Sequence, residues 1–265
     1  MTDEVDKLLQ LAQQVAAAGA VVHQQGFGRA LSPRAKSSEI DLVSEIDLET
    51  EQVMVAHILR ERPRDGIISE EGTNRLGQSD VCWILDPLDG TTNYLYGYPA
   101  FGIAVGVEIN GHGVAGIVYD TSSNHLYAGA IERGATCDSE PIMVSACSRL
   151  ETALIATGFL PDRRIRWQQG VVLAEVLPQV RDVRRSGSPI LDLCGVACGR
   201  LDGFYEWGLG RWDITAGAVI AKAAGATVTV LPQQGSPSPL LVASTPGIHA
   251  VLLEVVSSIW KRAKV

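Results

Sequence analysis

The chain has 265 residues and a formal net charge of −8, with 46% apolar and 20% charged residues. This length and composition exclude a disordered chain and a small fold that depends on disulfides. The acidic balance, without a block of Lys and Arg, disfavours nucleic acid as a partner. The longest uncharged window, residues 223–251, is interrupted by Pro and Gly, so no membrane span is expected.

Two helices are predicted at the start of the chain. Apolar residues recur at helical spacing over about residues 4–25, and a second helix is expected over about 44–62, where a proline ends it. The segment 31–43 between them is rich in Ser and charge, which predicts a loop with a short extended end. This loop carries Lys36, and the second helix carries Asp47 near its start.

From Val81 onward the sequence has β character. Short β-prone runs cover residues 81–85, 101–109, 113–120 and 125–131. The dipeptide Asn110-Gly111 between the second and third runs is typical of a tight hairpin turn. These runs predict an antiparallel meander.

After about Ile142, strand-like and helical segments alternate. The strand-like segments are residues 152–159, 182–186, 202–207 and 226–231. Helices are expected at 163–179, at 188–201, from Asp213 onward, and in a last segment ending near Trp260. This alternation predicts a parallel or mixed sheet with covering helices.

The most informative segment is WILDPLDGTTN, residues 83–93. An apolar strand is expected to end at Asp86, where Pro87 prevents a helix from starting, and Asp89 follows three residues later. Two carboxylates that face one point suit a hard divalent cation. A predicted helix start follows, formed by Gly90, Thr91 and Thr92. Its free N–H groups would favour a phosphate.

Three further acidic positions admit both a site role and an ordinary one. Glu70 and Glu71 follow a short apolar strand, where paired carboxylates repel unless a cation or solvent relieves them. Asp213 opens an Ala-rich helix, so N-capping alone would explain it. Asp47 also fits an exposed acid in a first helical turn. The residues alone leave these alternatives open.

The sequence resembles the inositol monophosphatase family, which comprises Mg²⁺-dependent, lithium-sensitive phosphatases. The resemblance spans essentially the whole chain and is carried by AKSS at 35–38, SEEG at 69–72, residues 83–93, and Trp212-Asp213 with the glycines that follow. It implies an α+β fold, a five-layered αβαβα sandwich. Residues 1–141 would carry an antiparallel sheet and most metal ligands, and residues 142–265 a mixed sheet, the substrate-side residues and the last ligand.

The resemblance also implies a cofactor of two or three Mg²⁺ ions. Glu70, Asp86 and the backbone carbonyl of Leu88 would hold one ion. Asp86, Asp89 and Asp213 would hold a second, and a weaker third would lie near Glu70. Asp47 and Thr91, with Glu70, would form the catalytic group that orients and deprotonates an attacking water.

A further set of residues is implied to bind the substrate. These are Lys36, Asp89, Gly90, Thr91, Thr92, Gly187, Ser188, Glu206 and Asp213. Lys36 fits a surface position equally well. Pro189 stands where relatives usually carry an alanine whose N–H would contact a substrate hydroxyl, and proline lacks that donor. This weakens the case for myo-inositol phosphate as the preferred substrate but not for phosphatase chemistry.

The sequence therefore predicts a phosphomonoesterase that hydrolyses myo-inositol-1-phosphate or a related small polyol phosphate. The alternatives are a fructose-1,6-bisphosphatase, a phosphatase of NADP or 3′-phosphoadenosine 5′-phosphate, a histidinol-phosphate phosphatase, and a non-catalytic partner of the transcription machinery. Family resemblance predicts a homodimer. The acidic N-terminus does not resemble a signal peptide, and the five scattered cysteines fit buried, reduced thiols, so a cytoplasmic protein is expected.

Overall fold

The computed structural model describes residues 2–28, 34–35, 42–232 and 239–263. Lys36 lies outside these ranges. The helices are α1 (Thr2–Gly26), α2 (Glu45–Glu61), α3 (Thr91–Tyr96), α4 (Arg163–Val176), α5 (Pro189–Ala197), α6 (Arg211–Ala223) and α7 (Pro246–Arg262), with 3₁₀ turns at Leu150–Thr152 and Leu177–Gln179. In the described part of the chain, no helix combines the length and the apolar character that crossing a membrane requires.

The strands fall into two large sheets and one short pair. The short pair is β1 (Arg34–Ala35) and β2 (Leu42–Val43). The first large sheet holds β3 (Gly66–Ser69), β4 (Asn74–Arg75), β5 (Val81–Asp89), β6 (Gly102–Ile109), β7 (His112–Asp120), β8 (His125–Ala130), β9 (Gly134–Cys137) and β10 (Glu140–Ile142). The second holds β11 (Leu154–Thr157), β12 (Asp182–Arg184), β13 (Gly203–Trp207), β14 (Thr227–Leu231) and β15 (Leu240–Ser244).

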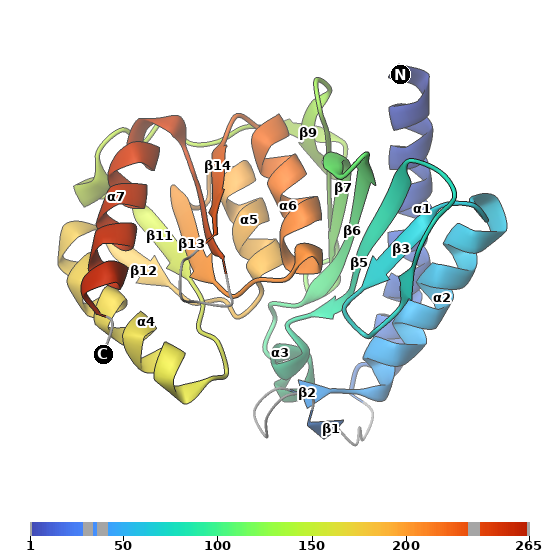
Figure 1. Ribbon diagram of the computed structural model, residues 1–265, viewed down its shortest axis with the longest axis horizontal. Coiled ribbons are helices and arrows are strands. Elements are labelled where there is room, and N and C mark those ends of the chain that lie inside the picture. Colours follow the sequence, from blue (N-terminus) through green and yellow to red (C-terminus); the bar gives the residue numbers. More distant parts are fainter. Residues whose placement is uncertain (1, 29–33, 36–41, 233–238, 264–265) are drawn as a thin grey trace.

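Helices and sheets alternate across the molecule (Figure 1). α4 and α7 cover the outer face of the second sheet, α5 and α6 lie between the two sheets, and α1 and α2 cover the outer face of the first. The order of layers is thus helix, sheet, helix, sheet, helix, which confirms the predicted αβαβα sandwich.

The first sheet has the strand order β10-β9-β8-β7-β6-β5-β3-β4. Its neighbours are antiparallel except for β3 and β5, so the predicted antiparallel sheet contains one parallel pair. The pair arises because β4 turns back along β3 at the sheet edge and the chain then returns to β5. Asn110 and Gly111 have φ of 52° and 77°, which confirms the predicted hairpin between β6 and β7.

The second sheet is mixed, as predicted. β11 pairs parallel with β12 and β13, whereas β15 pairs antiparallel with β13 and β14. The sequence did not predict β15, although every residue of this strand is buried. Prolines at 237 and 239 stand just before it, in a window already interrupted by other breakers, and they obscured the strand signal.

The middle layer of helices packs closely on the first sheet. Gly116 on β7 and Gly129 on β8 lie against the α6 backbone at Ala216 and Ile220, where a Cβ would overlap it. These glycines therefore let α6 approach the strands. The apolar residues of α5 and α6 share a core with the inner face of this sheet, which fixes the first turn of α6 beside the end of β5.

Candidate active site

An irregularity near the end of β5 places two carboxylates together. Asp86 pairs with Ala104 of β6 and Asp89 with Gly102, so β5 contains one extra residue between these pairs. Side chains three residues apart point to opposite faces of a regular strand, and the bulge turns both toward one side. The predicted strand end at Asp86 is wrong, because β5 continues to Asp89. Pro87, which has no N–H to pair, lies within the irregular segment.

A third carboxylate comes from the first turn of α6. Oxygen atoms of Asp86, Asp89 and Asp213 all lie within 4.8 Å of one another. Oδ2 of Asp213 also accepts the Gly210 N–H at 2.6 Å. The helix-start role and the membership of the acidic cluster are therefore compatible, and the sequence treated them as alternatives.

The electrostatics of this cluster are unfavourable for the protein alone. Burial raises the pKa of Asp86, and the carboxylates of Glu70, Asp89 and Asp213 raise it further. Burial likewise raises the pKa of Asp213, and raises that of Asp89 to about 7 although hydrogen bonds from Ser188, Ile190 and Gly90 oppose the rise. Oδ2 of Asp86 is buried, and no N–H or O–H of the described residues donates to it. Several carboxylate oxygens that could act as metal ligands, one of them without a hydrogen-bond donor, suit a hard divalent cation.

The parallel pairing of β3 and β5 adds Glu70 to the group. Ser69 aligns with Leu85, and the Glu70 N–H donates to the Leu85 carbonyl at 3.1 Å. Glu70 and Asp86 are the residues that follow this last aligned pair, so they lie beside one another. The sequence pattern did not predict this parallel pair, which is the physical reason that the two acids meet.

Asp47 is not the exposed helix acid that the sequence left as an alternative, because its side chain is completely buried. Oδ2 accepts from the backbone N–H of Ser44 at 2.8 Å and from its hydroxyl at 2.5 Å. Oδ1 accepts from the Thr91 hydroxyl at 2.9 Å. The Leu88 carbonyl is a second acceptor for this hydroxyl at 3.0 Å. The contact links the start of α2 to the start of α3.

The predicted helix start after Asp89 is present as the short helix α3. Gly90 has φ of 81°, and a Cβ there would meet the carbonyl of Ala100, so a glycine is required. The Asn93 amide donates to the carbonyls of Ala100 at 2.6 Å and Ser186 at 3.0 Å. This amide connects the site to the segment that leads into α5.

The segment before α5 contacts the acidic cluster directly. The Ser188 hydroxyl donates to Oδ2 of Asp89, and the Ile190 N–H donates to the same oxygen at 3.1 Å. Ser188 is fully buried. Its hydroxyl hydrogen is therefore engaged with a carboxylate. Pro189 is the first residue of α5, a position that favours proline because its N–H would have no helical partner.

A second group of acids, Asp192 and Glu206, lies near Asp89. Burial raises the pKa of Glu206 to about 8 and that of Asp192 to about 7. The negative charge of a neighbouring carboxylate contributes to the rise in each case. The Arg185 guanidinium opposes both shifts. A Cβ at Gly158 would overlap the Glu206 carboxyl, and one at Gly187 would overlap the Arg185 side chain, so both glycines make room for charged groups.

Comparison with known proteins agrees with this geometry. A family model described as "Inositol monophosphatase family" matches residues 4–261. The chain belongs to this family. Its members are metal-dependent phosphatases that act on small phosphate esters, and the described acidic cluster is in keeping with that chemistry.

Several relatives are similar over most of their length. The inositol-1-monophosphatase of Mycobacterium bovis is 42% identical over 230 residues, which cover 83% of this chain and 79% of the relative. The Nus factor SuhB of Vibrio cholerae is 36% identical over 225 residues, covering 81% and 82%. The solved structure of the suhB protein from Bartonella henselae superposes with a TM-score of 0.87 at 30% identity, covering 94% of this chain and 98% of that one.

Two contributors to the site were not predicted from the sequence. His23 of α1 is buried, and burial lowers its pKa to about 4, so its ring is neutral at pH 7. Nε2 contacts the Pro87 carbonyl at 2.9 Å and Nδ1 contacts the Thr121 hydroxyl at 2.9 Å. The carbonyl can only accept, so Nε2 carries the proton and supports the bulge. Asp192 was the other omission. A lone histidine and a lone acid within helical patterns gave no signal.

The structure brings together most of the positions expected from the family resemblance, and two of them, Thr92 and Lys36, differ from the rest. The acids, Thr91 and Leu88 meet at the end of β5. Glu206 lies close enough to Asp192 and Asp89 for their charges to raise its pKa. Thr92 is exposed at the start of α3. Lys36 is outside the described residues, so its expected role stays a prediction.

Proposed function

We propose that this chain is a Mg²⁺-dependent phosphomonoesterase that hydrolyses inositol monophosphate or a related small polyol phosphate. The single observation that supports it best is the buried Asp86 carboxylate, which has an oxygen without a donor among three further carboxylates. Such an arrangement repels itself unless cations neutralise it. Membership of a family of metal-dependent phosphatases supplies the reaction class.

The proposed cation ligands are those that meet at the end of β5. Glu70, Asp86 and the Leu88 carbonyl would hold one Mg²⁺, and Asp86 with Asp89 and Asp213 a second, with a weaker third near Glu70. When bound, these ions would offset the carboxylate charge, activate the attacking water and stabilise the departing alkoxide. The Ser188 and Ile190 donors hold Asp89 in one orientation, and the Leu88 N–H does the same for Oδ1 of Asp86 at 3.1 Å.

Thr91 and Asp47 form the proposed route for the proton of the attacking water. The Thr91 hydroxyl has one hydrogen, and when it donates to Asp47 its lone pairs remain free to accept from water. A proton can then pass from the water to Oγ1 of Thr91 while the Thr91 proton passes to Oδ1 of Asp47. The two Ser44 bonds occupy the other Asp47 oxygen and keep the carboxylate in place.

The alcohol portion of the substrate is proposed to lie against Glu206 and the start of α5. The Glu206 carboxyl is positioned by its fit against Gly158 and would bind a ring hydroxyl. Pro189 offers no N–H there, so the start of α5 contributes one donor fewer than an alanine would. Gly187, Ser188 and the α3 start at Gly90, Thr91 and Thr92 complete the proposed substrate-binding set.

Phosphate release from a substrate panel tests the proposal. The panel contains inositol-1-phosphate, fructose-1,6-bisphosphate, histidinol phosphate, NADP and 3′-phosphoadenosine 5′-phosphate, each with Mg²⁺ and with EDTA. We expect Mg²⁺-dependent turnover that is fastest with inositol-1-phosphate. Faster turnover of another compound would reassign the substrate. Failure to hydrolyse any of them, or full activity in EDTA, would refute the proposal.

A second candidate function follows from a relative's name. The Vibrio cholerae protein is named a Nus factor, so a binding role in addition to, or instead of, hydrolysis is the alternative. In a strain that lacks this protein, the variant Asp89→Asn distinguishes the two. If the variant loses hydrolysis yet restores the wild-type phenotype, the binding role is the main one. If it fails to restore it while remaining folded, hydrolysis is.

Three further expectations accompany the proposal. We propose that the chain forms a homodimer, which light scattering would test, and that lithium inhibits it, which the same phosphatase assay would test. We also propose that residues 1–141 and 142–265 act as two halves with the site between them. Limited proteolysis in the presence and absence of Mg²⁺ would test this division, since ions bridging the halves should slow cleavage near residue 142.

A further inference from the structure

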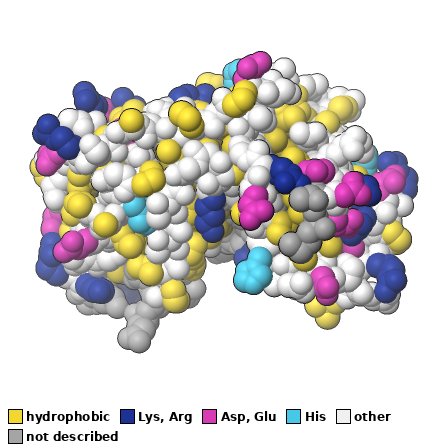
Figure 2. Space-filling model, turned by 90° about the horizontal axis from the view of Figure 1, so that it is seen from above, with side chains coloured by type: hydrophobic (Ala, Val, Ile, Leu, Met, Phe, Trp, Pro, Cys, Tyr) yellow, Lys and Arg dark blue, Asp and Glu magenta, His cyan; other side chains and the backbone are white. Residues whose placement is uncertain are grey.

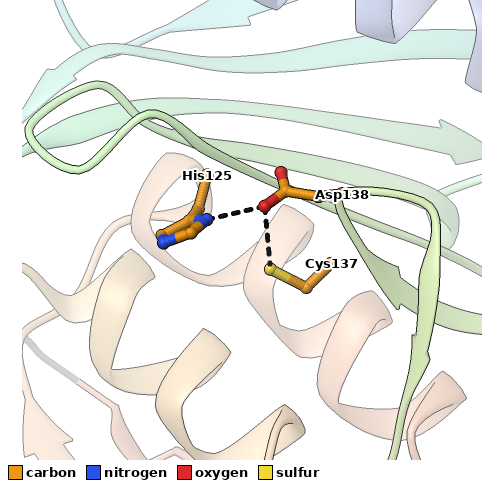
Figure 3. A group of neighbouring side chains, drawn as sticks. All are labelled: His125, Cys137 and Asp138. Carbon is orange, nitrogen blue, oxygen red and sulfur yellow. Dashed lines mark hydrogen bonds and ion pairs between the residues drawn. The ribbon is translucent and has the colours of Figure 1, made fainter.

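Three side chains with metal-binding atoms meet where β8 begins and β9 ends (Figure 3). His125 is the first residue of β8, Cys137 is the last residue of β9, and Asp138 follows in the next turn. One nitrogen, one sulfur and one oxygen atom from them lie within 4.8 Å of one another. The set combines three ligand types and is not merely a group of acids.

The backbone explains why these side chains converge. Tyr127 pairs with Cys137 across β8 and β9, and the Asp138 N–H donates to the Leu126 carbonyl at 2.9 Å. The pairing brings Asp138 toward the first residue of β8. Asp138 and Ser139, with φ of 51° and 71°, form the two-residue turn into β10. The position of all three ligands is thus set by strand pairing.

The Asp138 carboxylate is oriented by the backbone. Its Oδ1 accepts the Leu126 N–H at 2.8 Å, which leaves Oδ2 directed at the other two side chains. Oδ2 lies 2.6 Å from Nδ1 of His125 and 3.9 Å from Sγ of Cys137. A backbone donor that fixes a carboxylate in this way is typical of the outer shell around metal ligands.

The spacing is close to that of a tetrahedral zinc site. Ligands placed 2.0–2.3 Å from one ion stand about 3.3–3.7 Å apart. Nδ1 and Oδ2 must therefore separate by somewhat less than 1 Å, and the sulfur must approach slightly. His125 and Asp138 have about half of their side-chain area exposed, which permits this adjustment and leaves a fourth position for water.

The chemistry of the ligands selects the ion. Imidazole and thiolate favour Zn²⁺ and disfavour Mg²⁺, which prefers oxygen ligands. Burial raises the pKa of Cys137, so the thiol keeps its proton until a cation displaces it.

The sheet order places β7 and β6 between β8 and β5, so the group stands about 14 Å from the end of β5, at strand spacings of 4.7–4.9 Å.

We propose that His125, Cys137 and Asp138 form a second cation site, which binds one Zn²⁺ and is separate from the acidic cluster at the end of β5. The ion exchanges one water ligand for each side chain, and the Cys137 proton passes to solvent. Nδ1 of His125 gives up to solvent the hydrogen that faces Oδ2 of Asp138, the neutral ring carries its hydrogen on Nε2, and the Nδ1 lone pair binds the ion. Zn²⁺ joins β8 to the β9–β10 turn and stabilises this region of the sheet.

Cobalt provides a direct test because Co²⁺ bound to a thiolate has a charge-transfer band in the near ultraviolet. EDTA-stripped full-length protein is first saturated with Mg²⁺ to fill the acidic cluster and is then titrated with Co²⁺. The wild type should develop the band with one equivalent. Cys137→Ser should abolish it, whereas the matched control Cys198→Ser, which removes another half-buried thiol, should retain it.

The other two ligands are tested by affinity. Asp138→Asn keeps a side chain that tolerates the turn and can still accept the Leu126 N–H, yet should weaken Zn²⁺ binding roughly tenfold or more in a chelator competition. His125→Gln should do the same. Zn²⁺ should raise the melting temperature of the wild type and not that of Cys137→Ser. Absence of the cobalt band in the wild type, or its persistence in Cys137→Ser, would show only a His–Asp ion pair and overturn the proposal.

Discussion

Two buried aspartates beside opposite ends of β5 differ in how their charge is satisfied. Asp65 lies near the start of the strand and accepts from Arg62 at 2.7 Å, Ser79 at 2.7 Å and the Trp83 indole at 3.0 Å. Asp86 lies near the end and has a buried oxygen with no donor among the described residues. The comparison shows that burial alone does not identify a functional acid. An acid whose own protein leaves it unsatisfied among like charges indicates a ligand.

The largest effect is expected when the unsatisfied acid is neutralised. Asp86→Asn removes a proposed ligand to both ions, so Mg²⁺-dependent phosphatase activity should fall roughly 10³-fold. In EDTA the same change removes a repelling charge, so the free energy of unfolding should rise. Phosphate release and denaturant unfolding in EDTA measure the two effects. An active variant, or one that is less stable without metal, would contradict the account.

Asp65→Asn is the matched control and should show the opposite pattern. It replaces a charged acceptor by a neutral one for three donors, so the free energy of unfolding should fall by about 2–3 kcal/mol. Activity at a temperature where the variant is folded should stay within a few-fold of wild type. The same two assays compare the variants. A loss of activity as large as that of Asp86→Asn would erase the distinction between the two ends of β5.

The proton route gives the next largest effect. Thr91→Val removes the hydroxyl that contacts Asp47 but keeps the side-chain shape, so kcat should fall roughly 10²-fold with little change in KM. Thr91→Ser should keep most of the activity. Steady-state kinetics with saturating Mg²⁺ separate the two constants. If valine and serine behave alike, Thr91 does not take part in proton transfer.

The pH dependence of stability should differ with and without metal. The pKa of Asp89 is about 7, above the ordinary value of 3.8, so between pH 4 and 7 the folded protein retains a proton that the unfolded chain has lost. This contribution to stability is lost as pH rises through that window in EDTA, and Mg²⁺ should remove the loss. Neutral His23 contributes with the opposite sign in both buffers, so thermal melting curves with and without Mg²⁺ are compared at each pH.

The smallest effect is expected on the substrate side. Burial raises the pKa of Glu206 to about 8, so its carboxyl is largely protonated at pH 7 in the free protein. Glu206→Gln resembles that neutral form and should raise the KM for inositol-1-phosphate by less than about tenfold, with kcat nearly unchanged. Glu206→Ala should raise it further. A large fall in kcat for the glutamine variant would place Glu206 in the chemical step instead.

The order of helices and strands was largely predictable because periodicity and turn residues are local signals. The helix of α1, the meander from β5 to β8 and the Asn110-Gly111 turn all follow from such patterns. The bulge between Asp86 and Asp89 does not, because it depends on pairing with β6. The buried strand β15 was missed for a different reason, since the prolines just before it interrupt its apolar run.

The site could be predicted only in part. The resemblance of residues 83–93 to one family indicated the acids that meet at the end of β5. Residue patterns alone could not decide between a site role and an exposed first-turn acid for Asp47, or between a site role and N-capping for Asp213. The structure shows that these acids accept backbone hydrogen bonds within the site. The support from His23 and the charges near Asp192 depend on contacts between segments far apart in the chain, which no local pattern records.

Acidic and basic side chains are mixed on one face of the molecule (Figure 2). Figure 2 shows basic side chains interspersed with acidic ones on the face that it presents, without one broad basic patch. This face offers no extended electrostatic footprint of the kind that neutralises a series of nucleic-acid phosphates.

Calorimetric titration of Mg²⁺ into EDTA-stripped protein tests the central claim most directly. The claim is that the acids that meet at the end of β5 bind divalent cations. The account predicts at least two Mg²⁺ ions per wild-type chain, with the binding severely weakened in Asp86→Asn and unchanged in Asp65→Asn. A wild type that binds no Mg²⁺, or an Asp86→Asn variant that binds it as tightly as wild type, would contradict the account.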